Sequence, residues 1–121
     1  MSFMSTEISL DNGKIAVAIR AARTAVGWNQ QEFSEKMGVA KSTVARIETL
    51  EISAKGEFIL RALRLFREAG VDVDLYQSSG VTITVADSAI ASALADLQNE
   101  EKRRRDRRVG LAGLLPRQDE D

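Results

Sequence analysis

Two short amphipathic segments that meet at one glycine constrain the fold of this chain more than any other feature. The first segment places Phe33 and Met37 four positions apart, which gives a helix one apolar face. Gly38 follows, and glycine adopts the left-handed backbone conformation that ends a helix at little cost. The second segment turns Val44 and Ile47 toward the same interior. The sequence therefore predicts two short helices packed across a tight corner.

Polar residues around these helices define their ends and one exposed face. Asn29 can cap the first helix, with Glu32 as its reciprocal partner in a capping box. The second helix is expected to start near Ala40 or Lys41. Its outward face should carry Lys41, Ser42, Ala45 and Arg46. A helix, a glycine corner and a helix with a polar outer face together indicate a helix-turn-helix, although a plain helical hairpin is the alternative.

Residues 14–70 resemble the Xre/Cro-repressor family of helix-turn-helix DNA-binding regulators. The residues that match the family pattern are Gly27, Gln30, Phe33, Gly38, Val39, Thr43, Val44, Ile47 and Glu48. The chain departs at Ser34, where the family usually has alanine, and at Ala40, where a serine or threonine cap is usual. The resemblance implies a mainly α fold: a four-to-five-helix repressor-like DNA-binding domain over residues 1–70, acting on double-stranded DNA.

The same resemblance assigns roles to the exposed polar residues. Lys41, Ser42 and Arg46 would face base edges in the major groove, and Arg46 suits a bidentate contact with guanine. The other predicted DNA-binding residues are Gln30, which would anchor a phosphate, Thr43, which would hold the backbone, and Lys55, at the start of a fourth helix. The family also implies a structural ion pair between Arg23 and Glu48, for which a surface arginine is the alternative.

The flanking helices are expected from caps and apolar spacing. Asp11 or Asn12 would start a first helix that ends at Gly27, and residues 1–10 are expected to be a frayed end, with a short strand or arm as the alternative. Trp28 is expected in the core. Ser53 would cap a fourth helix that ends at Gly70. Its apolar stripe is predicted to comprise Ile59, Ala62, Leu63 and Phe66.

After Gly70 the apolar period changes to two, which predicts a β-hairpin over residues 71–86. An isolated hairpin is marginal in water and has two open edges, so we expect it to form a sheet with a second copy of the chain. The expected dimerisation residues are Val73, Leu75, Val81, Ile83 and Val85. The alternative is a hairpin folded back on its own helices.

A last helix, capped by Asp87 or Ser88, would present Ile90, Leu94 and Leu97 on one face to the sheet or to a partner. Residues 71–108 are thus predicted to be a dimerisation module of hairpin and helix, and residues 109–121 a flexible tail. Residues 102–108 hold six cations, for which auxiliary DNA contact and plain solvation are both open.

Composition narrows the possible functions. The formal net charge is −1, so DNA affinity must come from a local basic face, which favours a site-specific binder. The chain has neither cysteine nor histidine, which removes thiol and imidazole chemistry and the usual zinc ligands. We expect no catalytic residue, no metal and no cofactor. Without a signal peptide or a membrane span at sequence level, a cytoplasmic location is expected.

These features together predict a homodimeric transcription regulator, most simply a repressor, on a palindromic operator. One alternative is an antitoxin that autoregulates through the same DNA-binding fold and binds a second protein through its C-terminal tail. Another is an adaptor that has kept the fold and lost DNA binding.

Overall fold

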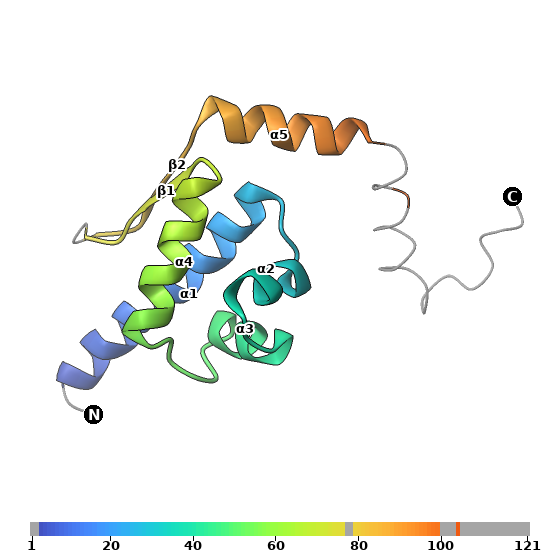
Figure 1. The fold of residues 1–121 in the computed structure, drawn as a ribbon. Coiled ribbons are helices and arrows are strands. Elements are labelled where there is room, and N and C mark those ends of the chain that lie inside the picture. The colour runs from blue at the N-terminus through green and yellow to red at the C-terminus, as the bar shows by residue number, and fades with distance from the viewer. Residues whose placement is uncertain (1–2, 77–78, 100–103, 105–121) are drawn as a thin grey trace, which may run out of the picture.

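The computed structural model describes residues 3–76, 79–99 and 104, and its helices and strands follow the predicted order (Figure 1). The elements are α1 (Phe3–Val26), α2 (Gln30–Met37), α3 (Lys41–Glu48), α4 (Gly56–Glu68), β1 (Val71–Asp74), β2 (Thr82–Val85) and α5 (Asp87–Gln98). The predicted fold class is confirmed: a mainly helical chain in which a helix-turn-helix region precedes a hairpin and a helix. The tail 109–121 and, apart from Arg104, the basic run 102–108 lie outside the described residues.

The first helix is longer than predicted. It begins at Phe3, so the expected start at Asp11 or Asn12 was wrong, as were a frayed end and a strand over residues 3–10. No proline or glycine separates Phe3 from Asn12, and a helix extends readily through residues of ordinary propensity once its core-facing turns are packed. The helix ends at Gly27, as predicted.

The corner between α2 and α3 has the predicted geometry. The side chain of Asn29 accepts a hydrogen bond from the Glu32 amide at 2.7 Å, and Glu32 Oε1 accepts one from the Asn29 amide at 2.8 Å, so the capping box is complete. Gly38 ends α2 with a φ of 72°, in the left-handed region that a glycine occupies without strain. Ala40 precedes α3 without a side-chain hydrogen bond to it.

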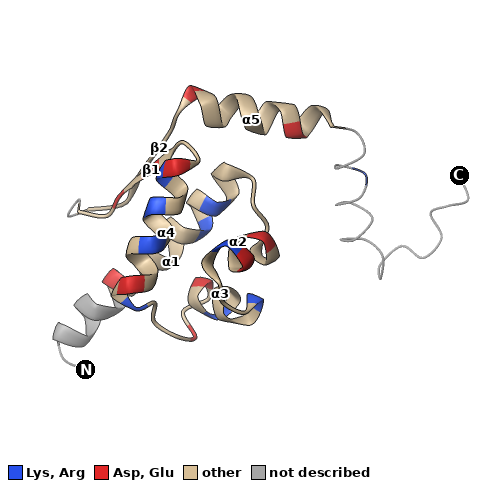
Figure 2. Cartoon of the chain, viewed as in Figure 1, with Lys and Arg blue, Asp and Glu red and all other residues tan. Residues whose placement is uncertain are grey.

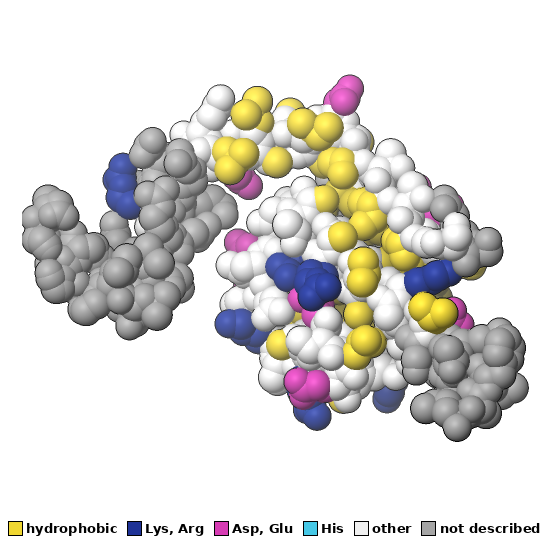
Figure 3. All heavy atoms as spheres, turned by 180° about the vertical axis from the view of Figure 1, so that it is seen from behind, with side chains coloured by type: hydrophobic (Ala, Val, Ile, Leu, Met, Phe, Trp, Pro, Cys, Tyr) yellow, Lys and Arg dark blue, Asp and Glu magenta, His cyan; other side chains and the backbone are white. Residues whose placement is uncertain are grey.

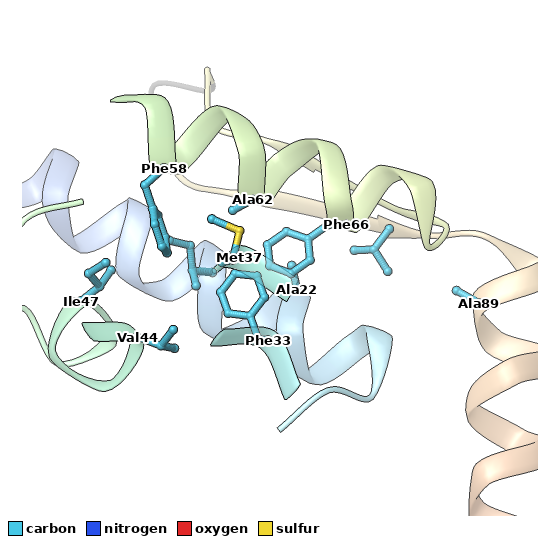
Figure 4. Close-up of a cluster of buried hydrophobic side chains, with 11 residues drawn as sticks. Ala22, Phe33, Met37, Val44, Ile47, Phe58, Ala62, Phe66 and Ala89 are labelled. Atoms are coloured by element: carbon cyan, nitrogen blue, oxygen red, sulfur yellow. The ribbon is translucent and has the colours of Figure 1, made fainter. Parts of the chain in front are cut away.

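Aromatic side chains form the centre of the core, and Figure 4 shows those from α2 and α4. Phe33 of α2 stacks on Phe66 of α4 with 5.2 Å between ring centroids, and Phe58 meets Phe33 edge to face at 6.3 Å. Trp28 packs against both Phe33 and Phe66 and is partly buried. Val44 and Ile47 of α3 complete the cluster, so the apolar faces predicted for α2 and α3 are confirmed.

Helix α4 starts later than expected. Its N-cap is Lys55, and the predicted cap at Ser53 was wrong. Ile52 and Ala54 on either side of Ser53 are partly buried against the core, and this holds the segment in a loop until Gly56. The predicted stripe is correct at its centre, because Ala62 and Phe66 are buried and Leu63 packs against them.

The hairpin packs on its own domain, which was the alternative left open by the sequence. Val71 pairs with Val85 and Val73 with Ile83, and all four side chains are buried in the core or packed against it. The strands are shorter than predicted, so Leu75 and Val81 lie outside them. Strand β1 stops at Asp74, whose carboxylate accepts a hydrogen bond from the Tyr76 amide at 2.9 Å and forms a local turn there.

Helix α5 extends from the hairpin along the end of the molecule away from α3 (Figure 1). It starts at Asp87 after Ala86, with no side-chain cap, so the predicted capping by Asp87 or Ser88 was wrong. Asp87 lies instead in the first turn, where a negative charge complements the helix dipole. The buried Ala89 fixes α5 to the domain, because it packs where Gly70 has no side chain.

One face of α5 carries a row of exposed apolar side chains. Ile90, Leu94 and Leu97 are each more than half exposed. In the view from behind, hydrophobic side chains gather along α5 and continue as a band down the body of the molecule (Figure 3). We call these three residues the α5 stripe. Within the described residues, no helix is both long enough and apolar enough to span a bilayer.

Candidate nucleic-acid interface

Helix α3 presents a polar, basic face to solvent. Lys41, Ser42 and Arg46 are exposed, whereas Val44 and Ile47 point into the core. The one acidic residue of α3 is Glu48, and it is buried. In the cartoon coloured by charge, the basic residues of α3 lie at the end of the molecule opposite α5 (Figure 2). A helix with such a face can approach phosphates and base edges without bringing a carboxylate of its own to the surface.

Thr43 and Lys55 lie beside this face in different environments. Thr43 is only partly exposed, and it lines a shallow pocket together with Val39 and residues of the loop before α4. Lys55 is exposed and forms the N-cap of α4, where the first amides of a helix have no intrahelical acceptor. A cation beside such amides suits a phosphate group.

Glu48 is held by a network that joins α1, α2 and α3. Its carboxylate accepts hydrogen bonds from Arg23 Nε at 2.7 Å and Arg23 Nη2 at 3.0 Å. Gln30 Nε2 donates a third hydrogen bond at 3.0 Å. Arg23 Nη1 also donates to the carbonyl of Trp28 at 2.9 Å. Only 2 % of the Glu48 side chain and 13 % of the Arg23 side chain are exposed. The network therefore fixes the orientation of α3 relative to α1 and α2.

Gln30 therefore has a structural contact that the sequence did not indicate. Its side chain is partly buried and one of its amide hydrogens is directed at Glu48. Gln30 stands at the first position of α2, so its backbone amide still lies among the free amides at that helix start. A phosphate near Gln30 would accept hydrogen bonds from the free backbone amides at the start of α2 and from the second N–H of the Gln30 side-chain amide.

The end of α3 carries a group that sequence reasoning missed. Leu50 has a φ of 65°, and the chain turns back so that Glu51 lies beside Arg46, with 3.7 Å between Arg46 Nε and Glu51 Oε1. The signal was present in the sequence as the run TLEISAKGEF, which replaces the glycine-bearing loop more usual in the family.

The fold and this face define a helix-turn-helix DNA-binding domain. Residues 19–70 match the family model HTH_3, described as Helix-turn-helix, and the resemblance to the Xre/Cro type is confirmed. Residues 19–70 accordingly form a domain of this type, which supports a DNA-binding transcription regulator, and the family is one of regulatory proteins and not of enzymes. No curated protein and no solved structure matches the chain.

Proposed function

We propose that the protein is a repressor that binds a palindromic operator as a homodimer. The observation that carries this proposal is the exposed face of α3, where Lys41, Ser42 and Arg46 stand together on a helix whose opposite side is anchored in the core. Arg46 would donate two hydrogen bonds to guanine O6 and N7, Lys41 would contact guanine or a phosphate, and Ser42 would contact either base type. Thr43, Lys55 and the start of α2 at Gln30 would hold the DNA backbone.

The test is selection of bound sequences from random duplex DNA, followed by binding measurements on Arg46→Ala. We expect the variant to lose about 1–3 kcal/mol at the selected site and to relax the preference at one base position, with little change on random DNA. Arg67→Ala is the matched control, because Arg67 is an exposed arginine that pairs with Asp72 beside the hairpin. Unchanged specific affinity in Arg46→Ala would refute base recognition by Arg46.

A second copy of the chain is proposed because one recognition helix covers only a few base pairs. Two copies on a two-fold axis present two half-sites, which must be about 34–36 Å apart to face one side of the duplex. Residues 71–98 offer two surfaces for this contact. The apolar face of the hairpin is occupied by its own domain, which leaves the backbone edges of β1 and β2 and the α5 stripe.

Substitutions in the α5 stripe test the dimer better than substitutions in the hairpin, since Ile83 also packs against the core. Leu94→Glu places a charge in the centre of the stripe and should yield a monomer in sedimentation, with unchanged helical circular dichroism and weaker binding to a palindromic site. Leu60→Glu is the control, because Leu60 is an apolar residue on α4 that is also more than half exposed. If Leu94→Glu remains dimeric, the strand edges become the proposed interface.

The exposed α5 stripe also favours a second candidate function, that of an antitoxin. In that case the stripe, alone or with the tail, would bind a second protein of different sequence. Purification of the full chain with its neighbouring gene products would then give a complex that Leu94→Glu dissolves. A wild-type chain that sediments as a dimer on its own and purifies without a second protein would favour the repressor.

A further inference from the structure

The backbone at the end of α3 brings Glu51 to Arg46. The Leu50 amide donates to the carbonyl of Ile47 at 3.2 Å, and the Glu51 amide donates to the carbonyl of Arg46 at 2.8 Å. With Leu50 in the left-handed conformation, these two bonds form the Schellman arrangement that closes many helices. In this arrangement the residue after the left-handed one lies beside the residue five positions earlier, and the two commonly make an apolar contact.

Here the two residues are charged instead. Glu51 Oε1 lies 3.7 Å from Arg46 Nε, and the other carboxylate oxygen lies 3.3 Å from the hydroxyl of Thr49. That hydroxyl also lies 2.9 Å from the Ala45 carbonyl, so the Ala45 carbonyl and the Glu51 carboxylate compete for its single proton at the end of α3. The backbone turn at Leu50 therefore places the Glu51 carboxylate beside the Arg46 guanidinium.

The atom that Glu51 approaches matters for DNA recognition. The close approach is between Arg46 Nε and Glu51 Oε1, an ion pair at 3.7 Å, and the guanidinium has further N–H donors in a planar fork at Nη1 and Nη2. Such a fork matches guanine O6 and N7. A free arginine has many rotamers and pairs equally well with any phosphate, whereas an arginine paired with a carboxylate has fewer orientations, and the pair as a whole carries no net charge.

We propose that Glu51 is a specificity-determining residue that positions Arg46 for a guanine and opposes its contact with phosphate. The proposal rests on the proposed function, in which Arg46 contacts a base. In the free protein 54 % of the Arg46 side chain and 64 % of the Glu51 side chain are exposed, so water weakens the pair. Entry into the groove removes that water and strengthens the interaction. Glu51 also repels the DNA backbone, and this repulsion lowers affinity for every sequence alike.

The experiment measures binding of the full chain to its selected site and to the same site with the Arg46-dependent guanine replaced. In Glu51→Gln the affinity for both DNAs should rise, because a negative charge is lost. The ratio between the two affinities should fall by about two- to fivefold, the range expected when an exposed ion pair is removed. Glu57→Gln is the matched control: Glu57 is an exposed acid in the first turn of α4, and its loss should raise both affinities and leave the ratio unchanged.

A second arm separates positioning from a general charge effect. In the Arg46→Ala background there is no guanidinium to position, so adding Glu51→Gln should leave the ratio as it is in Arg46→Ala alone. An unchanged ratio in the single variant Glu51→Gln, or the same fall in the Arg46→Ala background, would overturn the role of Glu51. A wild-type chain that selects no sequence would overturn the proposed function first, and that result is visible before any Glu51 variant is made.

Discussion

Removing Arg23 should destabilise the domain far more than removing another arginine. In Arg23→Met the carboxylate of Glu48, whose side chain is 2 % exposed in the wild type, loses two of its three hydrogen-bond donors and keeps only Gln30. An ionised group left buried without its partner costs about 3–5 kcal/mol. A domain of this size has a total stability of roughly 5–15 kcal/mol, so the loss is a large share of it.

Thermal and urea unfolding of the isolated protein measure this loss. At about 4–8 °C per kcal/mol for a domain of 60–100 residues, even the lower estimate shifts the melting temperature by more than about 10 °C. Arg67→Met is the control, because Arg67 and its partner Asp72 are both largely exposed, and exposed pairs contribute little. Its melting temperature should stay close to that of the wild type.

The double variant Arg23→Met, Glu48→Met completes the cycle. Since it removes the buried charge together with its partner, its loss should be clearly smaller than the sum of the two single losses. Small and additive losses would show that Arg23 and Glu48 do not act as a buried pair, and the reasoning from burial would then be refuted.

Three further changes test local features. Leu50→Gly should raise the free energy of unfolding by about 1 kcal/mol in urea titrations, because Leu50 pays for a φ of 65° that glycine adopts freely; a loss of stability would contradict strain at this position. Ala40→Ser should add about 1 kcal/mol by the same measurement, since Ala40 leaves the start of α3 without a side-chain cap, and an unchanged value would mean that water already satisfies those amides. Gly70→Ala would place a Cβ 3.0 Å from that of Ala89 at a φ of 93°, so it should destabilise the chain by about 1–3 kcal/mol and expose α5 to proteolysis; protection equal to wild type would argue against close packing there.

The features that could be predicted from the sequence are those with local causes. A capping box needs only Asn29 and Glu32 three residues apart, and Gly38 needs only the absence of a side chain. The apolar spacing of Phe33 and Met37 holds for any interior that the helix meets. Where a local cap signal competed with other influences, the predicted helix start was wrong. Asp11 and Ser53 are good caps in isolation, but a continuous helix through Asp11 and buried neighbours beside Ser53 overrode them.

The candidate site likewise has features that could be predicted from local sequence and features that could not. The exposed face with Lys41 and Arg46 follows from helical periodicity, and so could be placed before the structure was known. The pairing of Arg23 with Glu48 rested on family resemblance, since 25 positions separate the two residues and no spacing rule joins them. The hydrogen bond from Gln30 to Glu48 had no signal at all, because it depends on how α2 and α3 pack.

By itself the sequence determined the helix-turn-helix, the hairpin and the polar face of α3, because caps, turn residues and apolar periods act within a few positions of the chain. Only the tertiary structure decided where those elements face. It directed Val73, Ile83 and Val85 to their own core, because burying apolar side chains within one chain requires no second molecule. It left the α5 stripe in solvent because Ala89, packed at Gly70, sets which side of α5 meets the domain.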